Sequence, residues 1–446
     1  MLDRVLIANR GEIAHRLVSH YRALGVHTVA VYSDADADAP HVRAASAAVR
    51  LGPPPVAESY LNAPALLEAA RTSGAQAIHP GYGLLSENAG FAQLVRDAGL
   101  VFIGPPPSAI AAMGDKVAAR EVARRCGLPT VPGSDGAVSD EDAPSVAEAV
   151  GYPVLIKASA GGGGIGMEVA ASPEKLLKAI GRCRSRAARA FGSDTVYLER
   201  YVDRPRHIEI QVLFDAHGTG VSLFERECSV QRRHQKLVEE GPSVVMDRFP
   251  GLREAMGAAA VRLGQEVGYV GVGTVEFLVD LEGRFYFMEM NTRLQVEHPV
   301  TEAITGLDLP GWQLRVARGE RLDAAALAPR ISGHAIEVRV CAEDPSKGFL
   351  PQPGQLTALA WPFGVRVDSG VELGSTVAPF YDSLLAKIIA WGPTRGDAIA
   401  RLEAALDETR LEGVTSNLDF HRWLVRHPAF RAGELSTRFV DEHWGK

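Results

Sequence analysis

The chain has 446 residues, of which 46% are hydrophobic and 23% are charged, and its formal net charge is −7. This length and composition predict a soluble globular protein of two to four domains. The acidic balance argues against a bulk nucleic-acid surface, and no apolar run is long enough to cross a membrane. The start at Leu2 is typical of a buried strand and not of a signal peptide, so we expect a cytoplasmic protein without nucleic-acid or membrane partners.

Residues 1–113 alternate short apolar strands with helical segments. A helix extends from the turn at 9–12 to about Leu24. Strands are expected at 5–8, 28–32, 77–79 and 101–103. This alternation is typical of a parallel sheet with helices on its faces, and the single glycine of the first turn does not support a dinucleotide site. The loop 79–83, which contains Tyr82, follows a strand and is either a ligand-binding loop or a plain tight turn.

A run of four glycines at 161–164 lies between two strands expected at 153–158 and 167–170. A flexible linker would explain such a run, but linkers join domains, and this run joins adjacent strands of what looks like one sheet. A glycine loop at this place leaves backbone N–H groups open to an anion. Lys157 in the preceding strand adds a cation, so we favour a phosphate site.

The chain uses arginine for most of its positive charge, with thirty-nine arginines and only eight lysines. A lysine ammonium is compact and suits a phosphate oxygen where a planar guanidinium does not. Three lysines fall within glycine-rich or charge-rich motifs: Lys116, Lys157 and Lys236. The last lies in a dense polar cluster at 226–240. A surface helix or loop would explain this cluster, but its Gln231 and His234 beside Lys236 also suit a triphosphate and ribose.

The most informative pattern is a β-hairpin at 275–290, whose two halves alternate and are rich in Val, Phe and Tyr. A two-residue turn at 282–283 would place Glu276 opposite Glu289, with their Cβ atoms about 5 Å apart. On the apolar face the same register pairs Val275 with Met290, Phe277 with Met288, and Val279 with Tyr286.

Two glutamates directly opposite one another destabilise a sheet unless positive charge lies between them. Glu276 and Glu289, with Asn291 beside them, offer the hard oxygen ligands that Mg²⁺ prefers, and this ion usually carries phosphate on its other positions. The alternative is a solvated sheet face whose glutamates point at water. We favour the magnesium site.

After the hairpin, the segment 291–298 is strongly polar, and Pro299 opens a helix that ends near Gly306. The chain later returns to strands and ends in two helices. Strand 334–340 alternates, and a solvent-facing side chain is the default expectation for its Arg339. The four cysteines form no C-x-x-C pair, so neither zinc nor disulfides are predicted.

Taken together, these motifs resemble those of biotin carboxylase, the ATP-grasp enzyme that carboxylates protein-bound biotin. Each string is weak alone, but the series follows the family order essentially from end to end and is highly specific. The matching strings are 7–14 (IANRGEIA), 79–83 (HPGYG), 114–116 (GDK), 131–134 (VPGS), 161–164 (GGGG), 231–236 (QRRHQK), 289–293 (EMNTR), 295–302 (QVEHPVTE), 342–345 (AEDP), 349–351 (FLP) and 381–383 (YDS).

The resemblance implies a mixed α/β and α+β fold in three regions. The first is a Rossmann-like N-terminal domain at 1–113. The second is an ATP-grasp domain at 114–330, with a mobile glycine-rich lid at about 131–203. The third is a β-rich C-terminal domain at 331–446.

The resemblance also implies which residues would bind ATP and metal. The phosphates would be held by Lys116, Lys157 and the backbone of Gly162, Gly163 and Gly164. Adenine would lie against Glu199, Arg200 and Val202, and further nucleotide or cofactor contacts would come from His207, Gln231, His234 and Tyr82. Two Mg²⁺ ions, or Mn²⁺ in their place, would be bound by Glu276, Glu289 and Asn291.

For the reaction itself, the resemblance places bicarbonate against Arg293, Gln295 and the backbone of Val296. Glu297 would act as the general base that deprotonates bicarbonate for attack on the γ-phosphate. The resulting carboxyphosphate would break into CO₂ and phosphate, and phosphate would take the ureido proton of biotin. Arg339 would stabilise the enolate-like biotin oxygen, and Lys236 would be a further cation of the active site.

The chain departs from the family pattern at two places. Ile165 stands in the lid where family members usually carry Arg or Lys, which predicts ATP binding weaker by about 1–2 kcal/mol if that residue touches the nucleotide. Ser19 and Ala23 stand where charged residues often occur on the dimerisation helix. Because Arg366 and Glu408 remain on the other side of that surface, we expect a homodimer.

The chain has no Ala-Met-Lys-Met biotin-attachment string and no carboxyltransferase region. The biotin carboxyl carrier protein and the carboxyltransferase are therefore expected on other chains, or else the chain is a fragment of a longer polypeptide. An acyl-CoA carboxylase such as the acetyl-CoA carboxylase of fatty acid biosynthesis is favoured, with pyruvate or a urea-like acceptor left open. The alternatives are another ATP-grasp carboxylating ligase, which would not be expected to combine Arg339 with Arg293, Gln295 and Glu297, and a low-activity regulatory paralogue.

Overall fold

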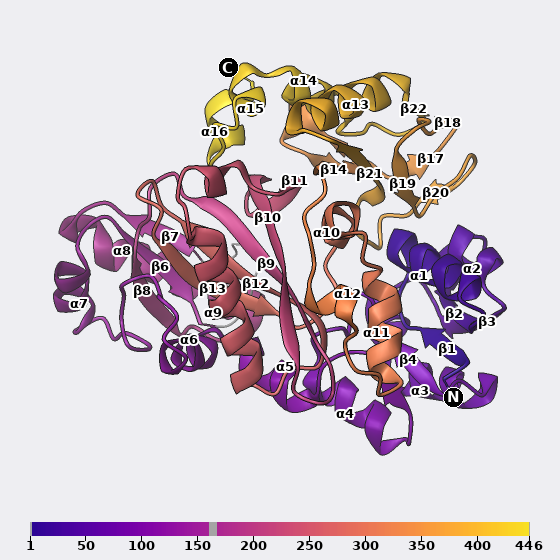
Figure 1. Cartoon of the computed structure of the whole chain (residues 1–446). Coiled ribbons are helices and arrows are strands. Elements are labelled where there is room, and N and C mark those ends of the chain that lie inside the picture. The colour runs from indigo at the N-terminus through magenta and orange to yellow at the C-terminus, as the bar shows by residue number, and fades with distance from the viewer. Residues whose placement is uncertain (1, 160–166, 446) are drawn as a thin grey trace.

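The computed structural model describes residues 2–159 and 167–445, which form three regions around a long central sheet (Figure 1). The N-terminal region contains a parallel sheet with the strand order β3-β2-β1-β4-β5. Its strands are β1 Arg4–Ile7, β2 His27–Ser33, β3 Ala47–Gly52, β4 Ala77–His79 and β5 Val101–Phe102. Its helices are α1 Gly11–Ala23, α2 Pro40–Ala44, α3 Ala63–Ser73, α4 Ala89–Asp97 and α5 Pro107–Gly114. The predicted parallel α/β layer is confirmed.

The loops that follow β1 and β4 lie at the same edge of this sheet. Helix α1 packs on the sheet through Ile13, Leu17 and Tyr21, which recur every four residues and are buried. The side-chain amide of Asn9, directly after β1, donates to the carbonyl oxygens of Pro80 and Tyr82 at 2.6 and 2.8 Å. These two hydrogen bonds fix the loop that carries Tyr82 against the end of β1.

The central sheet is antiparallel, with the strand order β13-β12-β9-β10-β11-β14-β21-β19. Its strands are β9 Arg206–Phe214, β10 Gly220–Arg232, β11 Gln235–Gly241, β12 Gly271–Val279, β13 Phe285–Asn291, β14 His334–Cys341, β19 Arg366–Ser369 and β21 Leu384–Gly392. Because β11 pairs with β14, the sheet is continuous from the middle of the chain into its C-terminal region. Helix α9 Leu252–Glu266 packs on β9 and β10 and contributes to their core.

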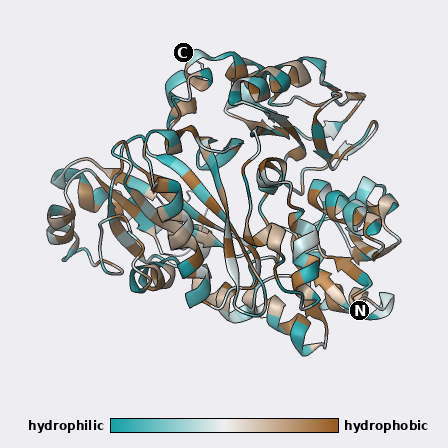
Figure 2. Cartoon of the chain, in the orientation of Figure 1, coloured by the Kyte–Doolittle hydropathy of each residue, from teal (hydrophilic) through white to brown (hydrophobic). Residues whose placement is uncertain are grey.

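Smaller elements complete the middle and C-terminal regions. Their helices are α10 His298–Thr305, α11 Leu309–Ala317, α12 Ala324–Leu327, α13 Arg395–Glu408, α14 Leu418–Arg426, α15 Pro428–Arg431 and α16 Phe439–His443. Their short strands are β15 Glu343–Asp344, β16 Leu350–Pro351, β17 Gly354–Gln355, β18 Ala358–Ala360, β20 Thr376–Val377 and β22 Arg410–Glu412. Apolar residues concentrate on the strands and on the inward faces of the helices (Figure 2).

A separate lobe holds the segments around the glycine run and lies to the left in Figure 1. Its strands, in the order β7-β6-β8, are β6 Val154–Ala158, β7 Met167–Ala170 and β8 Val196–Arg200. The helices in and beside it are α6 Lys116–Arg125, α7 Ala143–Val150 and α8 Pro173–Phe191. The lobe has a hydrophobic core of its own, which includes Ile156 and Leu176. The predictions made for Gly162, Gly163, Gly164 and Ile165 lie outside the described residues.

The hairpin of β12 and β13 pairs Glu276 with Glu289, as predicted. The turn, however, is not the expected two-residue turn at 282–283. The N–H of Asp280 donates to the carbonyl of Arg284 at 2.9 Å, so these two residues close the loop. The aspartate carboxylate stabilises this longer turn, because it accepts hydrogen bonds from the backbone N–H groups of Glu282 and Arg284.

The longer turn changes the apolar face of the hairpin next to it. Phe277 pairs with Phe287 and Val279 with Phe285, so the predicted pairs of Phe277 with Met288 and Val279 with Tyr286 are wrong. A register shift between Glu276 and Phe277 takes up one extra residue in β13. This β-bulge restores the predicted register beyond that point, where the two glutamates lie.

The polar cluster 226–240 lies in two paired strands, so the alternative of a surface helix or loop is wrong. Strands β10 and β11 pair from Glu227 opposite Glu240 to Arg232 opposite Gln235. Residues 226–231 are all buried. Their polar side chains satisfy one another inside the protein, a condition that hydropathy along the chain does not reveal.

Candidate active site

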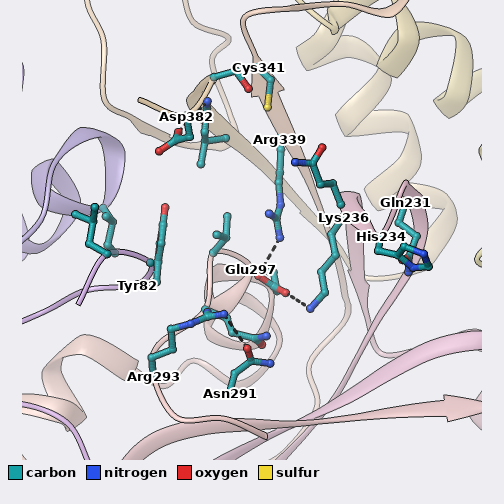
Figure 3. Close-up of a pocket in the computed structure, with 18 of the residues that line it drawn as sticks. Tyr82, Gln231, His234, Lys236, Asn291, Arg293, Glu297, Arg339, Cys341 and Asp382 are labelled. Atoms are coloured by element: carbon teal, nitrogen blue, oxygen red, sulfur yellow. Dashed lines mark hydrogen bonds and ion pairs between the residues drawn. The ribbon is translucent and has the colours of Figure 1, made fainter. Parts of the chain in front are cut away.

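A cavity of about 640 Å³ lies between the N-terminal loops, the hairpin and strands β11 and β14. Its volume is typical of a small-molecule site. Most of the residues predicted from the sequence line it: Tyr82, Lys116, Lys157, His207, Gln231, His234, Lys236, Glu276, Glu289, Asn291, Arg293, Gln295, Val296, Glu297 and Arg339. Figure 3 shows Glu297 between Lys236 and Arg339, with Arg293 and Asn291 on the opposite side of it.

The two hairpin glutamates are held by different cations. The carboxylate of Glu276 is buried and accepts hydrogen bonds from Lys236 Nζ at 2.8 Å and from Asn291 Nδ2 at 2.8 Å. Glu289 is partly exposed to the cavity, and its Oε2 lies 3.3 Å from Lys116 Nζ. The positive charge that two facing carboxylates require is therefore supplied, in the described residues, by one lysine for each.

Glu297 lies at the end of a polar segment, directly before α10, and both of its oxygens face cations. Lys236 Nζ donates to its Oε1 at 2.6 Å, and Arg339 donates to its Oε2 at 3.1 Å. Burial raises the pKa of the Glu297 carboxyl, but these two cations outweigh burial and hold that pKa well below its usual range. Glu297 is thus ionised and able to accept a proton at neutral pH. The expectation that Arg339 faces solvent is wrong, because this side chain points into the cavity.

Lys236 is the centre of the charge network. It donates to three carboxylates, those of Glu209, Glu276 and Glu297, at 2.6 to 2.8 Å. Burial lowers the pKa of Lys236, but these three partners raise it well above its usual value. The ammonium therefore stays protonated and connects Glu276 of the hairpin and Glu209 of β9 to Glu297.

Arg293 and the chain that follows it form the wall opposite Lys236. Arg293 donates to Asn291 Oδ1 at 2.7 Å and pairs with Glu87 at 2.8 Å. Glu87 also accepts the backbone N–H of Thr292 at 3.1 Å. Glu87 belongs to the N-terminal region and lies outside every motif described above, so the sequence held no signal for this contact.

A second contact that the sequence did not reveal is made by Lys387 of β21. This side chain is fully buried, and its Nζ donates to the carbonyl of Val296 at 2.7 Å. It also lies 3.4 Å from Glu12 of α1. The C-terminal region and the first helix thus meet at the backbone of the segment between Gln295 and Glu297.

Glu199, Arg200 and Val202 are not among the described residues that line the cavity. Glu199 is buried beside Lys157, with 2.6 Å between its Oε2 and the lysine Nζ, and it also contacts Arg120. Arg200 donates to the hydroxyl of Tyr286 at 3.0 Å. The adenine-binding role of these three residues stays a prediction.

Beneath the cavity lies Arg226, whose side chain is fully buried. Its Nε donates to Glu209 at 2.6 Å, and its remaining nitrogens donate to Gln211, Thr274, Gln295 and Thr301. A guanidinium with five donors can hold several strands together in this way. Arg226 therefore fixes Gln295 and Glu209 from below.

Replacing Arg226 with leucine should destabilise the protein strongly. The change leaves the buried carboxylate of Glu209 with one cation fewer, and breaking a buried ion pair in this way costs about 3–5 kcal/mol. Urea unfolding followed by circular dichroism measures the loss. Arg248→Leu, at an exposed position, is the matched control and should change stability by less than about 0.5 kcal/mol. Equal midpoints for the two variants would contradict a structural role for Arg226.

The donor set of the hairpin fits a divalent cation. Glu276, Glu289 and Asn291 offer two carboxylates and one amide oxygen on one side of the cavity, which is the chemistry that Mg²⁺ requires. Lys116 and Lys157 line the same cavity and can bind the phosphates that such an ion carries.

Three family models match this chain. Residues 115–325 match the ATP-binding domain of the carbamoyl-phosphate synthase L chain, and residues 1–110 and 337–442 match the N-terminal and C-terminal domains of biotin carboxylase. Fold and cavity together define an ATP-grasp enzyme. The particular family follows from relatives that match over nearly the whole chain.

Biotin carboxylase from Nostoc sp. is 49% identical over 443 residues, which cover 99% of each chain. A pyruvate carboxylase subunit from Methanothermobacter thermautotrophicus is 50% identical over 99% of this chain and 90% of its own. Among solved structures, a biotin carboxylase–β,γ-ATP complex from Campylobacter jejuni superposes with a TM-score of 0.96 at 43% identity, covering 99% of both chains. The chain belongs to the biotin carboxylase family.

A further solved structure describes a ligand-bound relative. The biotin carboxylase domain dimer of Hydrogenobacter thermophilus 2-oxoglutarate carboxylase, in complex with MgADP, ADP and bicarbonate, has a TM-score of 0.94 at 45% identity. It covers 99% of this chain and 98% of that one.

Proposed function

We propose that this protein uses ATP and bicarbonate to carboxylate biotin on a carrier protein, the first half-reaction of a biotin-dependent carboxylase. The observation that carries the proposal is the position of Glu297. It is ionised between Lys236 and Arg339 and faces the wall that contains Arg293 and Gln295. Such a carboxylate can act as a base toward a small acid bound at that wall.

ATP would bind with its phosphates at Lys116 and Lys157, while His207, Gln231 and His234 line the side of the cavity expected to contact the nucleotide. Glu276, Glu289 and Asn291 would hold Mg²⁺. When bound, the ions offset the negative charge of the phosphates during transfer. The relative with bound MgADP and the match to an ATP-binding domain support this assignment.

Bicarbonate would lie between Arg293, which offers a planar guanidinium, and the amide of Gln295. Glu297 takes its proton, and the freed oxygen attacks the γ-phosphorus of ATP, which releases ADP and forms carboxyphosphate. Carboxyphosphate breaks into CO₂ and phosphate. Phosphate takes the N1 proton of biotin, and N1 attacks CO₂. Arg339 stabilises the negative charge that develops on the ureido oxygen.

Arg339→Met should reduce carboxylation of free biotin by about 10²–10³-fold and leave nucleotide binding nearly intact. The change also removes a cation from Glu297, so the pKa of that carboxyl rises. On acidification, the variant therefore loses its ionised base at a higher pH than the wild type does. The acid limb of the pH profile for bicarbonate-dependent ATP hydrolysis should therefore move upward. An unchanged rate with biotin would remove Arg339 from its role.

Two alternatives make different predictions. Another ATP-grasp carboxylating ligase would carboxylate an amine and not biotin, and a regulatory paralogue would release no ADP. Adding bicarbonate and free biotin to the protein with MgATP and measuring ADP separates the regulatory paralogue from the enzymes. The combination of Arg339 with Arg293, Gln295 and Glu297 speaks against the other ligase. Ile165 is the feature that speaks for low activity, and it lies outside the described residues.

We propose that the biotin carrier and the carboxyltransferase lie on other chains and that the protein works as a homodimer in the cytoplasm. The family membership supports the two partners, and the relative described as a domain dimer supports the dimer. Among the described residues, no helix combines the length and the hydrophobicity that a membrane span requires.

The final acceptor is a separate question. The relatives are named for pyruvate, 2-oxoglutarate, propionyl-CoA and methylcrotonoyl-CoA carboxylases as well as biotin carboxylases. An acyl-CoA, with acetyl-CoA and fatty acid biosynthesis as the favoured case, stays our hypothesis. Capture of the biotinylated partner and its carboxyltransferase with this chain as bait would identify the acceptor.

A further inference from the structure

Two buried carboxyl groups that the proposed reaction does not use lie behind Arg339. Glu239 of β11 and Glu337 of β14 occupy directly opposite positions on adjacent antiparallel strands, and both residues are fully buried. Arg339 follows two residues after Glu337, so its side chain starts from the same face of the sheet. Its guanidinium donates to Glu239 Oε1 at 2.6 Å.

Three oxygens of this pair lack a partner. Glu239 Oε2 and both carboxyl oxygens of Glu337 receive no hydrogen bond from the described residues. Buried polar atoms in this state are costly, and two opposed ionised carboxylates are costlier still. A single proton on the pair resolves both problems, because it removes one charge and supplies the missing donor.

The surrounding charges are already engaged elsewhere. Arg339 is shared between Glu239 and Glu297. Lys387, which lies opposite Arg339 on β21, donates to the carbonyl of Val296 and also faces the carboxylates of Glu12 and Asp368. The buried His298 at the start of α10 lies near the same lysine and pairs with no anion closer than 3.9 Å. Lys387 and Arg339 are near enough to attract Glu337, but among the described residues no cation forms an ion pair or hydrogen bond with it.

We propose that Glu337 is protonated and donates a hydrogen bond to Glu239 through this proton. The proton removes one negative charge from the pair and so weakens the attraction that holds Arg339 away from biotin. Glu337 is then a positioning residue that acts through Glu239, and the inference rests on the proposed function. Arg339 moves away more readily from a carboxyl pair that holds one proton than from a pair in which both groups are ionised.

The electrostatic surroundings agree with the geometry. Burial raises the pKa of Glu337 well above its usual range, Lys387 and Arg339 oppose this rise, and Glu239 and Glu297 add to it. Burial also raises the pKa of Glu239, to about 7, although Arg339 opposes it. Because Glu239 holds the guanidinium, the proton belongs on Glu337. As pH rises through the pKa of Glu337, that proton is lost and Arg339 is held more tightly.

The test compares the wild-type chain with E337Q and E337L, using MgATP, bicarbonate and free biotin. The side chain introduced by E337Q is neutral and still a donor, so this variant should keep kcat/KM for biotin within about threefold at neutral pH. It should also lose the decline in kcat/KM that the wild type shows as the pH rises through the pKa of Glu337. Leucine supplies no donor, so E337L should lose about tenfold in kcat/KM for biotin with an unchanged KM for ATP. Glu148→Gln, at an exposed position of α7, is the control and should match the wild type.

A second measurement does not depend on activity. Infrared spectra of the wild-type chain without substrates should show the C=O stretch of a protonated carboxyl group, and E337Q should lack that band. A shared alkaline decline in wild type and E337Q, or identical infrared bands, would overturn the inference. If the wild type fails to carboxylate biotin, the proposed function fails, while the infrared band still decides whether Glu337 holds a proton.

Discussion

Glu297→Gln should abolish bicarbonate-dependent ATP hydrolysis, with a loss of about 10²–10⁴-fold in kcat, and should spare nucleotide binding. Glutamine has nearly the same shape as glutamate, but it cannot accept the proton of bicarbonate. In the wild type, Lys236 and Arg339 lower the pKa of the Glu297 carboxyl by more than burial raises it. Its activity as a base should therefore be lost only in strongly acidic solution. Release of ADP with and without bicarbonate measures the effect.

The matched control for this variant is Glu254→Gln, at an exposed position of α9, which should hydrolyse ATP at the wild-type rate. Binding of a fluorescent ATP analogue should differ by less than about threefold between the two variants. Normal turnover in Glu297→Gln would remove this residue from the role of general base. Loss of nucleotide binding in that variant would show a structural role instead.

The double variant Glu276→Gln, Glu289→Gln should bind MgATP at least about 10-fold more weakly and should lose nearly all turnover. Each substitution replaces a carboxylate with a neutral amide, which is a poorer ligand for Mg²⁺. The effect should depend on the metal, because ATP binding in the presence of a chelator keeps its contacts with Lys116 and Lys157. Isothermal titration with ATP, in Mg²⁺ and in a chelator, measures both affinities.

Equal losses with and without Mg²⁺ would contradict the metal assignment, since they would indicate disruption of the lysine network. Glu282→Gln is the control within the same hairpin. Its side chain lies at the exposed turn, away from the cavity, so binding of MgATP should be unchanged.

The elements best predicted from the sequence are those with an uninterrupted physical signal. Strand β1 is a short apolar run, fully buried from Val5 to Ile7, and it lies where expected. The pairing of Glu276 with Glu289 was also predicted correctly, although the turn was wrong. The longer turn shifts the register by one residue, and the β-bulge between Glu276 and Phe277 shifts it back. The predicted pairing is therefore correct where the two glutamates lie.

Contacts between distant segments could not be predicted, because no local pattern encodes them. Glu87 supports Arg293 from another region, and Lys387 reaches the carbonyl of Val296 across the sheet. The second part of strand β10, from residue 225 to 232, was not predicted for a related reason. Arg226 in this strand is polar, which suggested an exposed position. It is buried because side chains on other strands, among them β9 and β12, accept its hydrogen bonds.

A crystal structure with Mn²⁺ and a non-hydrolysable ATP analogue, in which anomalous scattering locates the metal, tests the magnesium site most directly. We expect metal peaks bonded to oxygens of both Glu276 and Glu289 and to the phosphates of the analogue. Metal bound elsewhere, or either carboxylate turned away from the nucleotide, would contradict the proposed phosphoryl transfer to bicarbonate.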